Sequence, residues 1–362
     1  MEWVLVVFFS FVSAMVLIPS AAILGKRFSI VDRPGEKKIH ERAVPCTGGF
    51  ALCVIFLICA LFLLYFCSGD AGAGGTSFLA GAAAGLIVIA LLGMYDDVRG
   101  AGAKVKFFVQ IVAALIAMSS GLVLDSILIP YDGSVSTGMF AYPLTLVWIV
   151  GITNAYNLID GLDGLASCIV AGVAAVISAI GFANGNTLPA TFAAVISVSS
   201  MTFYFFNRYP AKIFLGDTGS LILGYLLAVT SIMCLRTADG SVAFFPMVLV
   251  NGLVIGDTTL VFLRRLMAGR SPFSGDLDHV HHRMLRHTRS VRSSVRVLFA
   301  VTMVFAICGI ALLYEEGIKV VTSTVVAMVG LTLFFSRDAR GILAALLNLP
   351  GGVGKGRQEK PE

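Results

Sequence analysis

The stretch GITNAYNLIDGLDGLAS, from Gly151 to Ser167, places two asparagines, two aspartates and three glycines between two apolar runs that look like membrane helices. Polar groups near a bilayer are costly and are usually retained for function. The stretch therefore predicts a membrane protein that carries a polar site between two of its spans.

The composition agrees with this prediction. The chain of 362 residues is 57% hydrophobic and 13% charged, whereas soluble domains are about a quarter charged. Its mean hydropathy is +0.92. Because a helical span needs roughly 20 mostly apolar residues, we predict an all-α polytopic membrane protein with eleven spans. The fifth and eighth look short, which indicates that they extend into their polar flanks. The predicted spans are Val4–Leu24, Gly48–Cys67, Ser77–Met94, Val105–Leu124, Ala141–Ile152, Leu165–Phe182, Leu188–Phe206, Leu221–Cys234, Phe244–Leu263, Val297–Tyr314 and Val320–Phe335.

The basic residues predict the orientation. With eleven alternating spans, all but three of the 26 Lys and Arg fall on one side, the exceptions being Lys106, Arg236 and Lys319. The positive-inside rule makes that side cytoplasmic, with the N-terminus outside and the C-terminus inside. The net charge of +5 then reflects topology and gives no reason to propose nucleic-acid binding. We expect one catalytic domain over residues 1–336 and a partly disordered cytoplasmic tail over 337–362.

Two smaller features of the sequence fit this arrangement. The first apolar run has no basic residue before it and no convincing cleavage site, so it is expected to remain as a helix rather than to be removed as a signal peptide. The seven cysteines lie mostly inside apolar runs without metal-ligand spacing, which favours a packing role.

The polar motifs all fall on the predicted cytoplasmic side. A channel or transporter would more often place its ionisable groups at the membrane midplane or on both sides. An enzyme working at the inner membrane face is therefore favoured, with a cation transporter as the alternative. Besides the opening stretch, the motifs are DRPGEKKIHERAVPCTGG (Asp32–Gly49), YDDVRG (Tyr95–Gly100), FLGDTGS (Phe214–Ser220) and GRSPFSGDLDHVHHRML (Gly269–Leu285).

The residue types in these motifs indicate phosphate chemistry. Carboxylate and amide oxygens suit Mg²⁺, which binds one or two protein carboxylates together with substrate phosphate. Zinc is disfavoured because the few histidines have no cysteine beside them. A metal ion and nearby cations would neutralise charge in a phosphoryl-transfer transition state. The candidate oxygen ligands are Asp96, Asp97, Asp160, Asp163, Asp217, Asn154 and Asn157.

The acidic and amide motifs have structural alternatives. The adjacent Asp96 and Asp97 could be solvated interface charges, and since helical neighbours point about 100° apart they are expected to have different roles. Asn157 and Asp160, at i and i+3, could share a helical face. Gly161 and Gly164 would then end the helix and let substrate approach the backbone.

The remaining candidates also have two explanations each. Asp217 could be only an N-cap, or its helix N-terminus could hold a phosphate. The histidines of HVHHR could be a chance cluster in a basic loop. Asp257, about two turns before Arg264, could be a paired structural acid or a catalytic one.

Taken in order, YDDVRG, NAYNLIDGLDGLA, FLGDTGS and HVHHRM resemble the motifs of polyprenyl-phosphate N-acetylhexosamine-1-phosphate transferases, and the likeness covers nearly the whole chain. The resemblance implies eleven spans with an outside N-terminus in the bacterial inner membrane. It implies transfer of a sugar-1-phosphate from a UDP-sugar to a membrane polyprenyl phosphate, with release of UMP. Mg²⁺ is the implied cofactor, with Mn²⁺ as a substitute, and a homodimer is expected because relatives are often dimers.

The resemblance also implies roles for individual residues. Asp96 and Asp97 match acids that position or deprotonate the lipid phosphate. Asn157 and Asp217 match positions that hold Mg²⁺. Cys46 departs from the larger residue of several relatives, which weakens any role at that position. The implied catalytic residues are Asp96, Asp97, Asp160, Asp217 and His281. The implied substrate-binding residues are Asn154, Asp163, Phe214 (on uracil), Lys38, His40, His279, His282 and Arg283.

Details of the motifs favour the N-acetylglucosamine branch, which serves O-antigen, common-antigen, teichoic acid or arabinogalactan synthesis. Arg99-Gly100 stands where the peptidoglycan branch carries a lysine, and Val280 breaks its run of three histidines. The expected reaction joins N-acetylglucosamine-1-phosphate from UDP-GlcNAc to undecaprenyl phosphate. Phospho-MurNAc-pentapeptide or another UDP-N-acetylhexosamine is the alternative donor. A CDP-alcohol phosphotransferase is disfavoured because Ser167 and Cys168, rather than an arginine, follow DGLA.

Overall fold

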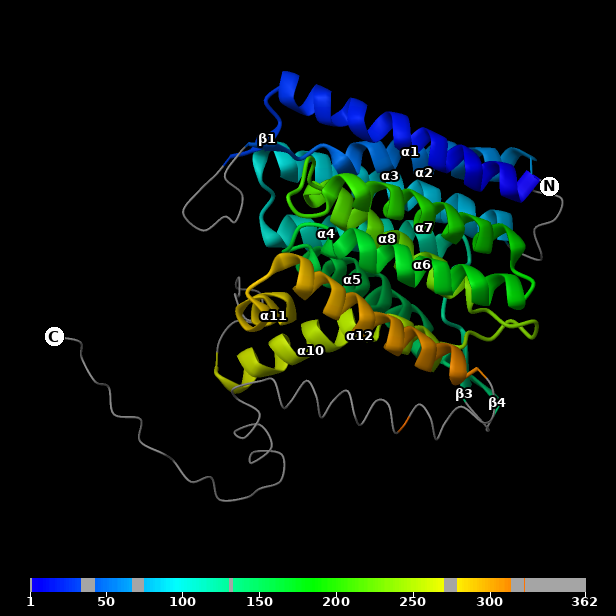
Figure 1. The fold of residues 1–362 in the computed structure, drawn as a ribbon. Helices are drawn as coiled ribbons and strands as arrows, with labels where there is room; N and C mark the ends of the chain where they lie inside the picture. The colour runs from blue at the N-terminus through cyan, green and yellow to red at the C-terminus, as the bar shows by residue number, and fades with distance from the viewer. Residues whose placement is uncertain are drawn as a thin grey trace, which may run out of the picture.

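The computed structural model describes residues 2–33, 43–66, 75–129, 133–269 and 279–313, together with Thr322. Most of these residues lie in helices that run along one common direction (Figure 1). The helices are α1 Glu2–Arg27, α2 Gly48–Phe66, α3 Gly75–Arg99, α4 Ala103–Ser119, α5 Ala141–Ile159, α6 Leu165–Ala183, α7 Thr187–Asn207, α8 Gly216–Cys234, α9 Phe244–Val250, α10 Gly252–Met267, α11 Val280–Thr288 and α12 Val291–Ala311. Short antiparallel pairs join β1 Val31–Asp32 to β2 Val44–Pro45 and β3 Ser126–Ile129 to β4 Gly133–Ser136.

Helix α8 is the centre of the bundle. It packs against α2, α3, α5, α6 and α7. Of the residues in its most apolar 18-residue stretch, 94% are buried. Small residues allow these close approaches, as is common where membrane helices pack. A Cβ on Gly224 would lie 2.8 Å from the carbonyl oxygen of Thr153, and one on Gly85 would lie 2.0 Å from the hydroxyl of Tyr225. Gly81, in the same helix as Gly85, likewise allows close packing, since a Cβ there would lie 2.2 Å from the hydroxyl of Ser120.

The outside of the bundle is apolar. Helix α1 exposes Val4, Phe8 and Ile23, each by more than half of its surface. Within the described residues, eight helices are long and apolar enough to cross a membrane, or nine if the bent pair α9 and α10 is one span. These features confirm a polytopic helical membrane protein. The predicted eleventh span, the tail over 337–362, Lys38 and His40 lie outside the described residues, Thr322 excepted.

The structure corrects one predicted span boundary and confirms two others. The fourth span was expected to reach Leu124, but α4 ends at Ser119 and the chain turns at Gly121 with a φ of +91°. The extension of the fifth and eighth spans into polar flanks is confirmed, because α5 runs on to Ile159 and α8 begins at Gly216. Residues 153–159 are therefore the last turns of a helix rather than a loop.

The ninth span was predicted as one helix, and this was wrong. Helices α9 and α10 meet at an angle of 82° around Asn251. The buried amide of Asn251 replaces the helical bonds lost there: its Nδ2 donates to the carbonyl oxygen of Met247 at 3.0 Å, and its Oδ1 accepts from the hydroxyl of Tyr156 at 3.0 Å. Side chains that insert into the helical hydrogen-bond ladder are a recognised cause of sharp bends.

Replacing Tyr156 with phenylalanine is expected to lower the midpoint of thermal unfolding of the detergent-purified protein. The change leaves Oδ1 of Asn251 buried without its donor, and an unpaired buried acceptor costs about 1–3 kcal/mol. Tyr142→Phe is the matched control, since Tyr142 lies in the same helix and is 63% exposed. Equal midpoints for the two variants would contradict this role of Tyr156.

Candidate active site

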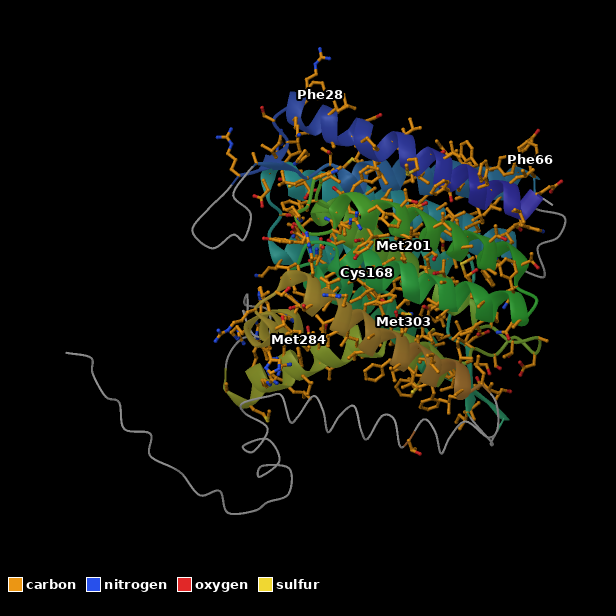
Figure 2. The ribbon with its side chains drawn as sticks, viewed as in Figure 1. Phe28, Phe66, Cys168, Met201, Met284 and Met303 are labelled. Carbon is orange, nitrogen blue, oxygen red and sulfur yellow. The ribbon has the colours of Figure 1, made fainter. Side chains whose placement is uncertain are left out.

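The polar motifs meet at one end of the bundle, where α1, α3, α5 and α7 finish and α2, α4, α6 and α8 begin; we call it the polar end. Figure 2 shows Phe28 and Met284 at this end and Phe66 at the opposite end. A cavity of about 480 Å³ opens here. Its lining includes Asp97, Asn157, Asp160, Asp163, Phe214, Asp217 and His282. Residues from four predicted motifs are therefore brought together.

Asp97, at the end of α3, caps the first turn of α8. One carboxylate oxygen accepts the backbone N–H of Asp217 at 2.7 Å, and the other accepts the N–H and hydroxyl of Thr218 at 3.0 and 2.5 Å. Gly93 permits this approach, since a Cβ there would lie 2.3 Å from the Cα of Thr218. A carboxylate is favourable at the positive end of a helix. The alternative that Asp217 caps its own helix is therefore wrong, because Asp97 supplies the cap.

Asp96 has different partners, in line with the predicted difference between the two acids. Its carboxylate accepts the backbone N–H of Ala101 at 2.5 Å and forms an ion pair with Lys106. The ammonium of Lys106 also lies 3.3 Å from Oδ2 of Asp217. Lys106 thus bridges two acids that come from α3 and α8.

The sequence reasoning missed Lys106 as a site residue. It was noted only as one of three exceptions to the charge asymmetry. The signal was present, because a single cation just inside an otherwise apolar predicted span is costly unless an acid pairs with it.

Asn157 and Asp217 lie side by side in the lining of the cavity. The amide of Asn157 donates to Oδ1 of Asp217 at 2.7 Å and to the hydroxyl of Ser220 at 2.8 Å. Asp160 follows on the same side, directly after the last turn of α5. Together with Ser220, these side chains offer carboxylate, amide and hydroxyl oxygens within one small region.

The charge around Asp160 fits the binding of a cation. Burial, and then the negative charges of Asp217, Asp163 and Asp97, raise the pKa of Asp160 to about 7. Within the described ranges no three carboxylate, histidine or cysteine side chains already converge as a complete metal cage. A Mg²⁺ ion that takes one or two protein oxygens and completes its shell with phosphate and water suits this arrangement.

Two loops that shape the cavity are tied together by Asn207, which the sequence reasoning also missed. Its Oδ1 accepts the N–H of Gly164 at 3.0 Å, and its Nδ2 donates to the carbonyl oxygen of Ile213 at 2.9 Å. Asp163 adds a bond from its Oδ2 to the N–H of Ala211 at 3.0 Å. An asparagine ending an apolar run was the available signal.

The first loop supports the segment that carries Phe214. The backbone N–H of Phe214 donates to Pro45 at 2.8 Å, and its carbonyl oxygen accepts from Gly48 at 3.0 Å. A Cβ on Gly49 would lie 2.1 Å from the nitrogen of Gly219. The Gly-Gly turn is therefore needed for close packing on α8, and Phe214 lines the cavity.

Asn154 does not reach the cavity. Its amide exchanges hydrogen bonds with Gln110 of α4, at 2.5 and 3.2 Å, and donates to the carbonyl oxygen of Val150 at 2.8 Å. It is also absent from the cavity lining among the described residues. The predicted contact with substrate is therefore not supported, and Asn154 braces α5 against α4.

The histidine cluster begins with a structural pair. His279 precedes α11, and its Nδ1 lies 2.8 Å from Oδ2 of Asp257. The other oxygen of Asp257 accepts the N–H of Val280 at 2.7 Å. Asp257 thus caps α11 and holds His279 at its start, as the structural alternative stated. Of the predicted histidines, His282 lines the cavity, and Arg283 follows it on α11.

His281 is buried against Gly161. A Cβ on Gly161 would lie 2.1 Å from Nε2 of His281, so this glycine makes room for the imidazole, and Gly161 also lines the cavity. The ring also stacks on His279, with centroids 5.8 Å apart. Burial, together with His282 and His279, lowers the pKa of His281 to about 3. His281 is therefore neutral at pH 7.

His281 is expected to make the folded protein less stable in mild acid than a variant that lacks its imidazole. A free imidazole titrates near pH 6.5, so the unfolded chain takes up this proton at a higher pH than the folded chain, whose pKa is about 3. The stabilisation is complete above pH ~6.5 and is lost as the pH falls toward 3. Thermal unfolding midpoints at about pH 7.5, 6 and 5 measure the decline. His281→Gln should decline less steeply, and a decline parallel to the wild type would disprove the assignment.

Comparison with known proteins places the chain in a family. The glycosyl transferase family 4 profile matches residues 79–235. The probable undecaprenyl-phosphate N-acetylglucosaminyl 1-phosphate transferase of Bacillus subtilis is 33% identical over 304 residues, 84% of this chain and 83% of that protein. The decaprenyl-phosphate N-acetylglucosaminephosphotransferase of Mycolicibacterium smegmatis is 30% identical over 344 residues, 85% of this chain and 84% of its own length.

A more distant relative from Escherichia coli, an undecaprenyl-phosphate alpha-N-acetylglucosaminyl 1-phosphate transferase, is 25% identical over 305 residues, 81% of this chain and 79% of the relative. The chain therefore belongs to glycosyl transferase family 4, the polyprenyl-phosphate N-acetylhexosamine-1-phosphate transferases, and is a glycosyl-1-phosphate transferase.

Proposed function

We propose that this protein transfers N-acetylglucosamine-1-phosphate from UDP-GlcNAc to undecaprenyl phosphate, releasing UMP and forming undecaprenyl-diphosphate-GlcNAc. The proposal includes a site that faces the cytoplasm from the bacterial inner membrane. The basic residues of the polar end support that orientation. The names of the relatives from three bacteria support N-acetylglucosamine over phospho-MurNAc-pentapeptide as the donor's sugar part.

The observation that carries the proposal is the meeting of Asn157, Asp160, Asp163 and Asp217 in one cavity beside the cation of Lys106. Such a set of oxygens would repel a diphosphate unless a metal ion balanced the charge. Asn157 and Asp217 would hold Mg²⁺, which supplies neutralisation of the diphosphate when bound. Phe214 offers an aromatic face in the same cavity for the uracil.

The acceptor phosphate is proposed to approach along α4. Val105, Phe107 and Phe108 are each at least half exposed around Lys106, which places that ammonium beside an apolar surface. A polyprenyl chain could lie on this surface while its phosphate contacts Lys106. Asp96 would hold Lys106 in place through their ion pair.

In the proposed reaction an oxygen of the acceptor phosphate attacks the β-phosphorus of the donor. The bond from that phosphorus to the bridging oxygen breaks, and the electron pair leaves with UMP. No side chain needs to become covalently attached, since a phosphate is already an anionic nucleophile. Both oxygens of Asp97 bind the N-terminal turn of α8, so Asp97 acts by holding Asp217 in position.

The test is an assay of the purified protein with radiolabelled UDP-GlcNAc, Mg²⁺ and undecaprenyl phosphate. The expected result is a labelled lipid product and one released UMP for each lipid formed. Other UDP-N-acetylhexosamines and UDP-MurNAc-pentapeptide serve as competing donors. If no lipid product forms from UDP-GlcNAc, the proposed activity is excluded. A stable phospho-enzyme formed without acceptor would exclude direct attack.

Lys106→Met is expected to lower kcat by about 100-fold or more, the usual effect of removing one charged donor from a phosphate or oxyanion site. The matched control is Lys104→Met, an exposed lysine two residues earlier on α4. The KM for undecaprenyl phosphate should rise in the first variant and stay unchanged in the second. Equal activity of the two variants would remove Lys106 from the site.

A further inference from the structure

A second, larger cavity lies next to the candidate active site. Its volume is about 670 Å³, and it is formed by the end of α7, the segment after it and the first turns of α12. Figure 1 shows the start of α12 at the polar end, beside α11. Asp163 lines this cavity and the candidate active site, and so forms part of the wall between them.

Four cations converge on this second cavity. Arg208 and Lys212 come from the segment after α7, and Arg292 and Arg296 come from successive turns of α12. All four are exposed, and none forms an ion pair with a carboxylate in the described part of the chain. Asp163, the one acid among the described residues of the lining, already binds the N–H of Ala211. The cavity therefore has an excess of positive charge.

Two of the cationic side chains, Arg208 and Arg292, contact neighbouring groups of the protein. The guanidinium of Arg208 lies 5.8 Å from the ring centroid of Phe205. Nε of Arg292 donates to the carbonyl oxygen of Tyr209 at 3.4 Å, which connects α12 to the segment after α7. Like charges gather in this way where an anion can neutralise them.

The surroundings indicate what kind of anion fits. The rings of Tyr204, Phe205 and Tyr209 also line the cavity, and aromatic side chains concentrate at the headgroup level of membranes. Nearby on the same two helices, Met201 and Val297 are exposed apolar residues. A ligand here meets cations at one end and an apolar surface at the other. Basic pockets between membrane helices commonly bind anionic lipid headgroups.

We propose that this cavity binds the phosphate of an anionic phospholipid headgroup, with the acyl chains lying on the apolar surface of α7 and α12. The site is separate from the one proposed to react, and the inference does not depend on the transferase activity. Through Asp163 and Asn207, a bound lipid would hold the segment that carries Phe214 and Asp217.

The experiment uses the full-length protein in nanodiscs of phosphatidylcholine with increasing fractions of phosphatidylglycerol. Native mass spectrometry counts the phosphatidylglycerol molecules that stay bound. The wild type should retain phosphatidylglycerol in preference to phosphatidylcholine. The double variant Arg292→Gln/Arg296→Gln should bind it about 10- to 30-fold more weakly, the effect of removing two cations near an anionic headgroup.

Two further variants and one soluble probe complete the test. Arg208→Gln/Lys212→Gln removes the cations of the opposite wall and should have the same effect. Lys26→Gln/Arg27→Gln removes two exposed cations from the end of α1 and should retain the lipid as the wild type does. Inorganic phosphate is added at millimolar concentration to protein in pure phosphatidylcholine. Equal lipid retention in all variants, or binding of inorganic phosphate without any preference for phosphatidylglycerol, would overturn the proposal.

Discussion

The site depends on the bond between the carboxylate of Asp97 and the first turn of α8. Helix α8 is enclosed by five other helices, and the N–H groups of its first turn have no acceptor within the helix itself. Buried donors must find an acceptor inside the protein. Because α3 supplies that acceptor, the ends of two helices are fixed to one another. Asp217, Thr218 and the glycines that pack beside them take their positions from this contact.

A second constraint is the negative charge of the aspartates that lie near this contact. Asp96, Asp97, Asp160, Asp163 and Asp217 gather at one end of the bundle, and Lys106 bridges two of them. Carboxylates interact more strongly where water is scarce. Burial, and then this surplus of negative charge, raise the pKa of Asp160. The site is therefore suited to bind a cation. The basic residues that could attract a phosphate group lie in neighbouring segments.

Much of the fold and the site could be predicted from the sequence, because lipid imposes regular apolar lengths and makes exposed polar motifs conspicuous. The ends of α5 and α8 and the gathering of Asp160 and Asp217 follow from that pattern. The bend at Asn251 could not be predicted, since it depends on a bond from Tyr156, 95 residues away in sequence. The role of Lys106 and the contact between Gly161 and His281 likewise depend on which helices become neighbours.

The contact between Gly161 and His281 limits which substitutions relatives can carry at these two positions. The imidazole of His281 fills the space that any side chain at position 161 would need. Neither position can therefore drift alone: a residue larger than glycine at 161 requires a smaller one at 281, and a smaller one at 281 leaves a void at 161. The two positions should covary among relatives, although 120 residues separate them in the sequence. The missing side chain at position 161 is thus expected to be visible as paired substitutions at positions 161 and 281.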